Sequence, residues 1–151
     1  MDKIEQLYTL IKETFFLLDD GDRHLFSEYE LSPSRFYAMV HINEEPGISS
    51  SGLSERLLCD KSNVTRIVRG LEKQGLIERR RHETDGRTLR LYLTENGLET
   101  CTQVQIALKQ YSETRLNGVG EDAQDKLLEN LDALNTVLQA DLALKHANNS
   151  K

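Results

Sequence analysis

The chain has 151 residues, of which 38% are hydrophobic and 29% charged, and its formal net charge is −6. This is the composition of an ordinary soluble globular protein, and the length is sufficient to bury a hydrophobic core. No apolar run approaches the ~18 residues of a membrane span, and residues 1–10 have no signal-peptide pattern. We therefore expect a cytoplasmic protein with no membrane partner.

Cysteines and histidines give little support for catalysis or metal binding. Cys59 and Cys101 have neither CxxC nor His-paired spacing, so no disulfide framework or zinc site is expected. The four histidines are scattered over different predicted elements, and no nucleophile elbow, phosphate loop or paired carboxylate motif occurs. His24 and Glu28 have helical spacing for a metal pair but lack a further ligand. We expect no enzymatic activity, no metal and no cofactor.

Two helices are predicted before residue 46. The first spans residues 2–18 and ends at residues 19–22, and it has apolar residues on two faces. These residues are Ile4, Leu7, Ile11, Phe15 and Leu18 on one face and Tyr8, Leu10 and Phe16 on the other. Residues 24–31 are ambiguous, with a short helical turn as one interpretation. Ser32 and Pro33 then begin a second helix as N-cap and first helical residue, and residues 45–47 end it.

Residues 49–74 are predicted to form two short helices joined by a tight turn. Ser49 caps the first helix, residues 50–57, and Asp60 caps the second, residues 61–74. In the second helix, apolar residues at positions i, i+3, i+4 and i+7 form one buried face: Val64, Ile67, Val68 and Leu71. Gly75 ends this helix. Gly70 within it costs about 1 kcal/mol relative to alanine and has no explanation in the pattern.

A β-hairpin and two long helices are predicted to complete the chain. Residues 76–81 and 87–94 alternate at period two about an Asp85-Gly86 turn, with Leu89, Leu91 and Leu93 facing inward. Thr94 caps a helix that reaches about residue 117. The last helix covers roughly residues 121–145, and its leucines approach a heptad pattern: Leu127, Leu131, Leu134, Leu138 and Leu142.

Charge is divided unevenly along the chain. Residues 49–94 contain ten basic and six acidic residues, a net charge of +4, and the remainder carries −10. Phosphate contacts depend on this local field rather than on the total charge. A short helix, a turn, a basic helix and a basic hairpin in this order predict a winged helix-turn-helix that places residues 61–74 in the major groove of double-stranded DNA. The predicted fold class is mainly α (α+β), with a small β-hairpin wing between long terminal helices.

Individual DNA contacts follow from the residue types. Arg66 and Asn63 are the candidates for base contact, because arginine pairs with guanine and asparagine with adenine, each for roughly 1–3 kcal/mol. Arg87 directly follows the hairpin turn and can reach a narrow minor groove, where Asp85 could hold its guanidinium or the wing backbone. Residues 79–81 add positive field. The remaining predicted DNA-binding residues are Ser62, Thr65, Arg69, Lys73 and Arg90.

The chain resembles the MarR family of transcriptional regulators in three segments: SNVTRIVRGLEKQGLI, the Asp85-Gly86-Arg87 wing, and LYLTENG. The resemblance is specific over about residues 31–98. It implies a homodimer with interlocking terminal helices, whose two winged units bind a pseudo-palindromic site. It also implies that Arg66 reads the major groove and that Arg87 enters the minor groove. Gly52, where the family usually has an acid, and Gly70 depart from the family pattern.

This resemblance implies a division of the chain into four parts. Residues 1–31 would form a dimerisation helix and linker, and residues 32–97 the DNA-binding domain. Residues 98–146 would form two dimerisation helices, and residues 147–151 a disordered tail.

The resemblance further implies a small phenolic or anionic effector, bound between the dimerisation helices and the winged unit. Five residues of the first two predicted helices could line that cleft, the alternative being that they belong to the core: Tyr8, Phe15, Phe36, Tyr37 and His41. We expect a ligand-responsive repressor. Two alternatives stay open, namely a thiol-based redox sensor of the same family that uses Cys59 and a protein-interaction module without DNA binding.

Overall fold

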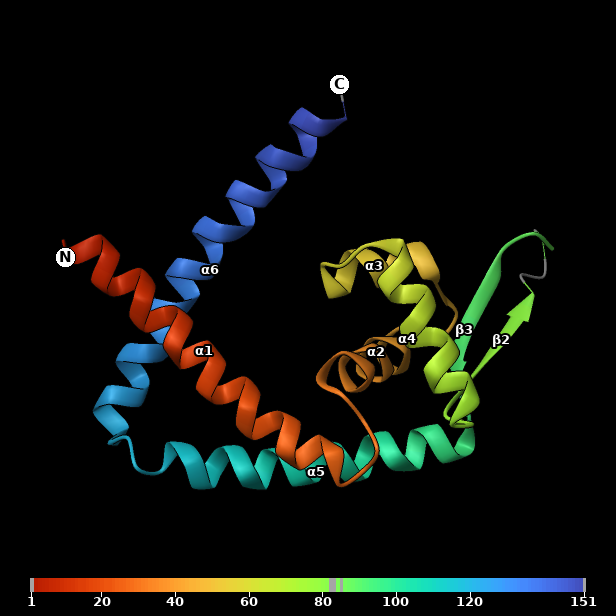
Figure 1. The fold of residues 1–151 in the computed structure, drawn as a ribbon, viewed down its shortest axis with the longest axis horizontal. Helices are drawn as coiled ribbons and strands as arrows, with labels where there is room; N and C mark the ends of the chain where they lie inside the picture. The colour runs from red at the N-terminus through yellow and green to blue at the C-terminus, as the bar shows by residue number, and fades with distance from the viewer. Residues whose placement is uncertain (1, 82–83, 85, 151) are drawn as a thin grey trace. The chain divides into compact units, whose positions relative to one another are not determined.

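The computed structural model describes residues 2–81, 84 and 86–150, and its elements confirm the predicted fold class. Figure 1 shows the helices and the hairpin in chain order. The elements are α1 (Lys3–Ser27), α2 (Pro33–Glu44), β1 (Ile48–Ser49), α3 (Ser50–Leu57), α4 (Lys61–Lys73), β2 (Ile77–Arg81), β3 (Leu89–Leu93), α5 (Glu95–Leu116) and α6 (Glu121–Asn149). The chain forms two compact units, one up to Lys109 and one from Gln110 onward. No helix among the described residues is long and apolar enough to span a membrane.

Helix α1 is longer than predicted. The acidic run at residues 19–22 does not end it, and the helix continues through Gly21 to Ser27. Arg23 pairs with Asp19 at 3.1 Å and with Asp20 at 3.4 Å, so these charges support the helix at i, i+4 and i, i+3 spacing. Near its end Phe26 is fully buried, with its ring 4.7 Å from that of Phe36. Tertiary packing and ion pairs thus outweigh the cost of one internal glycine.

The predicted caps of the next three helices are confirmed. The Ser32 hydroxyl accepts from the backbone N–H of Arg35 at 3.3 Å, and the Ser49 hydroxyl from that of Gly52 at 3.0 Å. A carboxylate oxygen of Asp60 accepts from the N–H of Asn63 at 2.8 Å. These caps satisfy backbone donors that a helix start leaves unpaired, and they fix where α2, α3 and α4 begin.

The sheet has three strands in the order β1-β3-β2, of which β1 was not predicted. Ile48 of β1 lies opposite Leu91, and Ile77 of β2 lies opposite Leu93. Leu91 is fully buried, as predicted. Leu89, predicted to face inward, is 40% exposed, because the hairpin extends beyond the hydrophobic core, which includes or contacts only Leu91 and Leu93 of β3.

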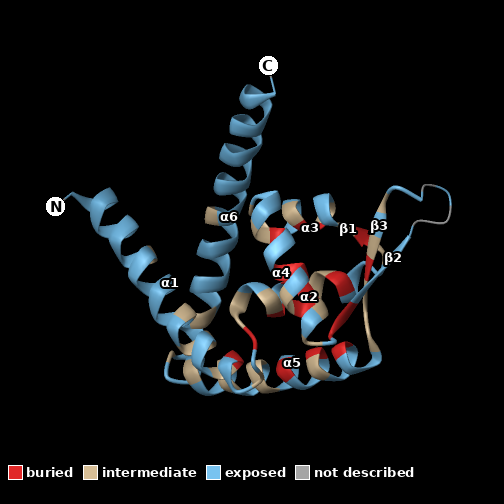
Figure 2. Cartoon of the chain, turned by 45° about the vertical axis from the view of Figure 1, so that its right-hand side comes forward, coloured by how far each residue is buried: buried red, intermediate tan, exposed pale blue. Residues whose placement is uncertain are grey.

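The hydrophobic core lies where α2, α3, α4, the sheet and the first half of α5 meet, and Figure 2 shows the buried residues gathered there. It includes all four apolar residues predicted for the buried face of α4: Val64, Ile67, Val68 and Leu71. Burial of this face turns the opposite face of α4 toward solvent.

The second unit is helical and has no buried residue in α6. The helix continues beyond the predicted residue 145 to Asn149, and Lys145 pairs with Asp141 at 3.0 Å within its last turns. Gln124 joins α6 to the end of α5 and to the loop between them, because it donates to the carbonyls of Leu116 and Val119 at 3.0 and 2.7 Å.

Helix α5 starts against the end of α4, and Gly97 permits this close approach. The Thr94 hydroxyl accepts from the N–H of Gly97 at 3.0 Å and donates to the carbonyl of Gly75 at 2.6 Å. A Cβ atom at residue 97 would lie 1.8 Å from the carbonyl oxygen of Leu76. Because that atom belongs to the backbone, a side chain at residue 97 would force the two segments apart.

Replacement of Gly97 by alanine should therefore lower the free energy of unfolding by about 3 kcal/mol and the melting temperature by about 10 °C. Thermal unfolding followed by circular dichroism measures both. Gly120→Ala is the matched control, because nothing lies within 4 Å of its Cβ position and its φ is −59°. Equal melting temperatures for Gly97→Ala and the unmodified protein would contradict the close contact.

Candidate nucleic-acid interface

Helix α4 exposes the polar and basic face that the sequence predicted. Five of the predicted DNA-binding residues on it are exposed: Ser62, Thr65, Arg66, Arg69 and Lys73. Asn63 is half-buried at the edge of this face. The helix therefore presents hydroxyl, amide and guanidinium groups together, which are the group types that contact base edges and phosphates.

The two residues predicted to read bases are hydrogen-bonded to each other. Arg66 donates from Nη2 to the side-chain oxygen of Asn63, one turn earlier on the helix. The guanidinium keeps further N–H donors, and the Asn63 amide keeps its own donor group. Arg66 and Asn63 thus form a small array of donors on the exposed side of α4.

The carboxylate of Asp60 caps the start of α4 and accepts two hydrogen bonds there. The backbone N–H of Asn63, and then the Ser62 hydroxyl at 2.8 Å, lower the pKa of its carboxyl group from the ordinary value. The carboxylate therefore stays ionised at neutral pH. Its charge is compensated at the N-terminus of the helix that carries Arg66.

The three consecutive arginines of β2 have different environments, which the sequence did not reveal. Arg79 makes two hydrogen bonds to the carboxylate of Glu72, at 2.8 and 2.7 Å. Arg80 pairs with Glu78, and its guanidinium lies 4.3 Å from the centre of the Tyr92 ring. Arg81 is exposed, and no ion pair or hydrogen bond joins its side chain to another described residue. Of the three, Arg81 carries the least compensated charge.

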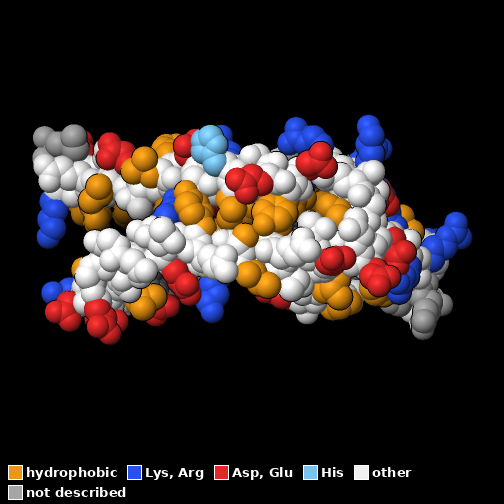
Figure 3. Space-filling view, turned by 90° about the horizontal axis from the view of Figure 1, so that it is seen from below, with side chains coloured by type: hydrophobic (Ala, Val, Ile, Leu, Met, Phe, Trp, Pro, Cys, Tyr) orange, Lys and Arg blue, Asp and Glu red, His pale blue; other side chains and the backbone are white. Residues whose placement is uncertain are grey.

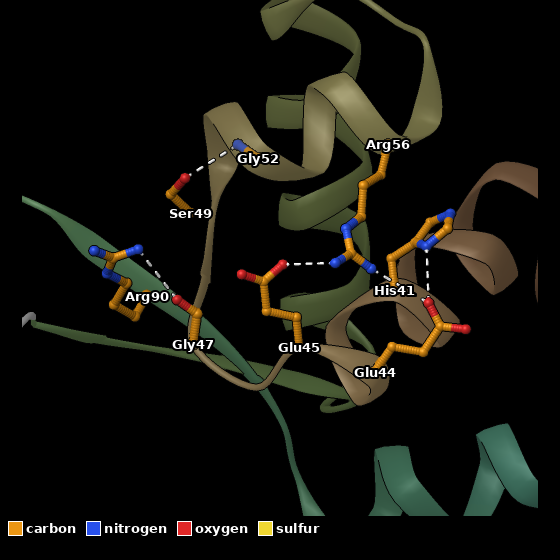
Figure 4. Close-up of polar contacts among 8 residues, drawn as sticks. All are labelled: His41, Glu44, Glu45, Gly47, Ser49, Gly52, Arg56 and Arg90. Atoms are coloured by element: carbon orange, nitrogen blue, oxygen red, sulfur yellow. Dashed lines mark hydrogen bonds and ion pairs between the residues drawn. The ribbon is translucent and has the colours of Figure 1, made fainter. Parts of the chain in front are cut away.

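The remaining wing residues are placed unequally. Arg87 is exposed, as predicted. Asp85, predicted to support it, lies outside the described residues. Arg90 is half-buried, and its Nη1 atom donates to the carbonyl of Gly47 at 3.4 Å (Figure 4). Its Nε atom is buried without a partner among the described residues. The side chain of Arg90 thus reaches from β3 to the residue that precedes β1, a strand that the sequence did not predict.

An ion-pair cluster fastens α3 to the end of α2 (Figure 4). Arg56 pairs with Glu44 at 3.3 Å and with Glu45 at 2.9 Å. His41 Nδ1 lies 3.3 Å from the same Glu44 carboxylate. The cluster is partly exposed, so each pair contributes little by itself, but together they restrain the angle between α2 and α3.

Within one chain, only two of the five residues predicted to line a ligand cleft are in contact, namely Phe36 and Tyr37, whose ring centres are 5.3 Å apart. Phe36 is buried in the core against Phe26, and His41 belongs to the ion-pair cluster. Tyr8 and Phe15 are 64% and 57% exposed, so neither the core nor a cleft holds them within this chain. The reason is that only the C-terminal part of α1, around Phe26, packs on α2.

Tyr37 lines a pocket of about 340 Å³ beside α4. Its other lining residues come from α2, α3, the α3–α4 turn and α4: Ser34, Leu57, Cys59, Asn63, Arg66 and Ile67. Burial, and then the charges of Asp22 and Asp19, raise the pKa of the Tyr37 hydroxyl. Tyr37, which lines this pocket together with Asn63 and Arg66, therefore stays protonated at neutral pH.

Both cysteines favour the thiol form. Burial and the neighbouring Asp60 carboxylate raise the pKa of Cys59, and burial raises that of Cys101. Among the described residues no three His, Cys, Asp or Glu side chains are grouped as metal ligands would be. His24 lies 3.7 Å from Asp20, its partner one turn earlier in α1.

Comparison with known proteins identifies similar regulators. Residues 31–89 match the family model described as the MarR family. The chain is 28% identical over 137 residues to the HTH-type transcriptional regulator BilQ of Clostridium symbiosum, covering 91% of this chain and 93% of that protein. The structure of the transcriptional regulator BldR from Sulfolobus solfataricus has 25% identity and a TM-score of 0.78, and 93% of this chain and 99% of that chain are covered. FabT of Streptococcus pneumoniae, solved in complex with DNA, has 21% identity, a TM-score of 0.80 and coverage of 91% and 99%.

Proposed function

We propose that this chain is a transcriptional regulator of the MarR family, which it matches over residues 31–89, and that it acts as a ligand-responsive repressor that binds a pseudo-palindromic operator as a homodimer through its winged helix. The observation that carries DNA readout is the hydrogen-bonded Asn63–Arg66 pair in the first half of α4, with Arg66 exposed. Helices in this position of a helix-turn-helix enter the major groove. Arg66 and Asn63 then contact base edges, while Ser62, Thr65, Arg69 and Lys73 contact phosphates.

The wing supplies the second set of contacts. Arg87 enters the minor groove, whose narrow form attracts arginine. Arg81 adds a phosphate contact, because its charge is not compensated by a described neighbour, whereas Arg79 and Arg80 are held by carboxylates. Arg90 has a structural role in the wing, because its hydrogen bond to the Gly47 carbonyl joins β3 to the residue before β1.

The apolar side chains that each unit leaves exposed support the proposed homodimer. Figure 3 shows hydrophobic side chains at the surface of one face. On α1 the exposed large hydrophobics are Ile4, Leu7, Tyr8, Leu10, Phe15, Phe16, Leu17 and Leu18, and on α6 they are Leu127, Leu128, Leu131, Val137, Leu138, Leu142 and Leu144. Exposed apolar surface of this extent marks an interface. Pairing of two copies through these helices covers it and sets the spacing of two winged units.

The effector site is the pocket that contains Tyr37. Its volume of about 340 Å³ suits a small molecule, since ligand pockets start near 300 Å³. The protonated Tyr37 hydroxyl can donate to a carboxylate, and the Arg66 guanidinium supplies a positive charge. A phenolic acid bound there engages Arg66 and Asn63, and so competes with DNA readout. The redox alternative is less favoured, because the raised pKa of Cys59 lowers the fraction of reactive thiolate.

Replacement of Arg66 by alanine should lower affinity for the operator about tenfold or more, because one bidentate base contact is lost. Affinity for random DNA should fall much less. Fluorescence anisotropy on both duplexes measures the ratio, after footprinting on DNA that flanks the protein's own gene has located the operator. Arg23→Ala, which removes the same charge from α1, is the control. Equal losses on both duplexes would refute base readout.

Sedimentation at micromolar concentration should show a dimer. Charged substitutions in the leucine pattern of α6, Leu131→Glu with Leu138→Glu, should shift the protein toward monomer, since each buries a carboxylate in the apolar contact. Gln139→Glu adds the same charge at an exposed position of the same helix and should leave the dimer intact. A monomer in the unmodified protein would disprove the proposed assembly.

Removal of the Tyr37 hydroxyl by Tyr37→Phe should weaken the effect of 4-hydroxybenzoate on operator binding about tenfold, because one hydrogen bond to a charged group is lost. The measurement is the concentration of 4-hydroxybenzoate that releases half of the bound operator. Tyr111→Phe, on α5 in the other unit, is the matched control. Release at the same concentration in Tyr37→Phe and the unmodified protein would exclude this pocket as the effector site.

A further inference from the structure

The structure explains why α4 has a glycine in its interior. A Cβ atom at residue 70 would lie 2.3 Å from Nη2, 2.6 Å from Cζ and 2.8 Å from Nε of Arg35. The guanidinium of Arg35, from the first turn of α2, therefore lies directly against the helix backbone at Gly70. Any side chain at residue 70 would displace it. Gly70 is thus the contact surface for Arg35, and this outweighs its cost of about 1 kcal/mol in helix propensity.

Hydrogen bonds extend this contact to the loop between α1 and α2. Arg35 donates from Nη1 to the side-chain oxygen of Gln74 at 3.0 Å. The amide nitrogen of Gln74 donates to the backbone carbonyl of Glu30 at 2.7 Å. Glu30 has a φ of +57° and stands between Ser27, the last residue of α1, and α2. The second half of α4 is therefore tied by polar contacts to two neighbouring segments of the same unit.

The contact of Arg35 with Gly70 also affects the orientation of Arg66. Residues 66 and 70 are four apart, so they lie on the same flank of α4, one turn from each other. The positive charge of Arg35 at residue 70 disfavours the approach of a second guanidinium from that side. Arg66 is turned the other way along the helix, toward Asn63.

We propose that Arg35, laid across Gly70 and bonded to Gln74, is a positioning residue that orients α4 and its Asn63–Arg66 pair for sequence-specific DNA readout. It acts through the helix and does not itself contact DNA. This inference rests on the proposed function, since it assumes that α4 reads DNA.

A double-mutant cycle tests the proposal. The probe is a duplex selected from a random-sequence pool by the unmodified protein, and a scrambled duplex reports non-specific binding. Arg35→Ala and Gly70→Ala should each reduce affinity for the selected duplex about tenfold, the loss expected for a hydrogen bond to a charged group. The double variant should also lose about tenfold, and not about a hundredfold, because Gly70→Ala acts by displacing Arg35.

Two outcomes of the cycle would overturn the proposal. Additive losses would mean that the new methyl group at residue 70 interferes by a different route. A loss of the same size on the scrambled duplex, with a weaker salt dependence, would mean that Arg35 contacts phosphate directly. If the unmodified protein prefers no sequence in the pool, the proposed function fails and this inference fails with it. A preference in the unmodified protein that Arg35→Ala leaves unchanged rejects the positioning role alone.

Gln74→Ala provides a second variant that changes no charge, should Arg35→Ala fail to fold. It removes both the bond from Arg35 and the bond to Glu30, and it should lower the ratio of specific to non-specific affinity about tenfold. Gln103→Ala is its matched control, because Gln103 lies on α5 and bonds only weakly to Glu99, at 3.4 Å. The melting temperature of each variant is measured alongside. An unchanged affinity ratio for Gln74→Ala would also overturn the proposal.

Discussion

Burial of one face of α4 is the constraint on which the rest of the winged unit depends. Val64, Ile67, Val68 and Leu71 are removed from water together, and this fixes the rotation of the helix about its axis. Every polar group on the opposite side then faces solvent in a set order. Burial of four aliphatic side chains stabilises this arrangement by roughly 6–12 kcal/mol before entropy is deducted, far more than any single polar contact nearby.

Polar contacts further restrain the orientation of α4 that burial of its apolar face determines. Asp60 defines where α4 begins, Arg35 and Gln74 restrain its second half, and the Thr94 hydroxyl joins its end to α5. Each contact is modest, since a typical net hydrogen bond contributes about 1 kcal/mol. These contacts orient the helix more than they stabilise it. Apolar packing alone permits small rotations of α4, which would move the end of a long arginine side chain by several ångströms.

The sequence contains a basic segment, residues 49–94, and an acidic remainder. Within the basic segment, ion pairs with neighbouring carboxylates determine which arginines keep an uncompensated charge. Residues 49–94 carry +4 against −10 elsewhere. Within β2, however, Glu72 and Glu78 compensate Arg79 and Arg80, and Arg81 is left exposed. The count of arginines therefore overstates the charge available to a phosphate, and the arrangement of neighbouring carboxylates decides which arginines are available.

The order of the helices, their caps at Ser32, Ser49 and Asp60, the buried face of α4 and the hairpin could all be predicted from the sequence. These features depend on local periodicity and on contacts a few residues apart. The length of α1, the strand β1, the bond of Arg90 to Gly47 and the contact of Arg35 with Gly70 emerged only from the tertiary structure. These depend on residues distant in the chain, such as Phe26 on Phe36 and Gly47 beside Arg90. A local sequence pattern indicates which secondary structure a segment can form. The segments that pack against it are determined only by the tertiary fold.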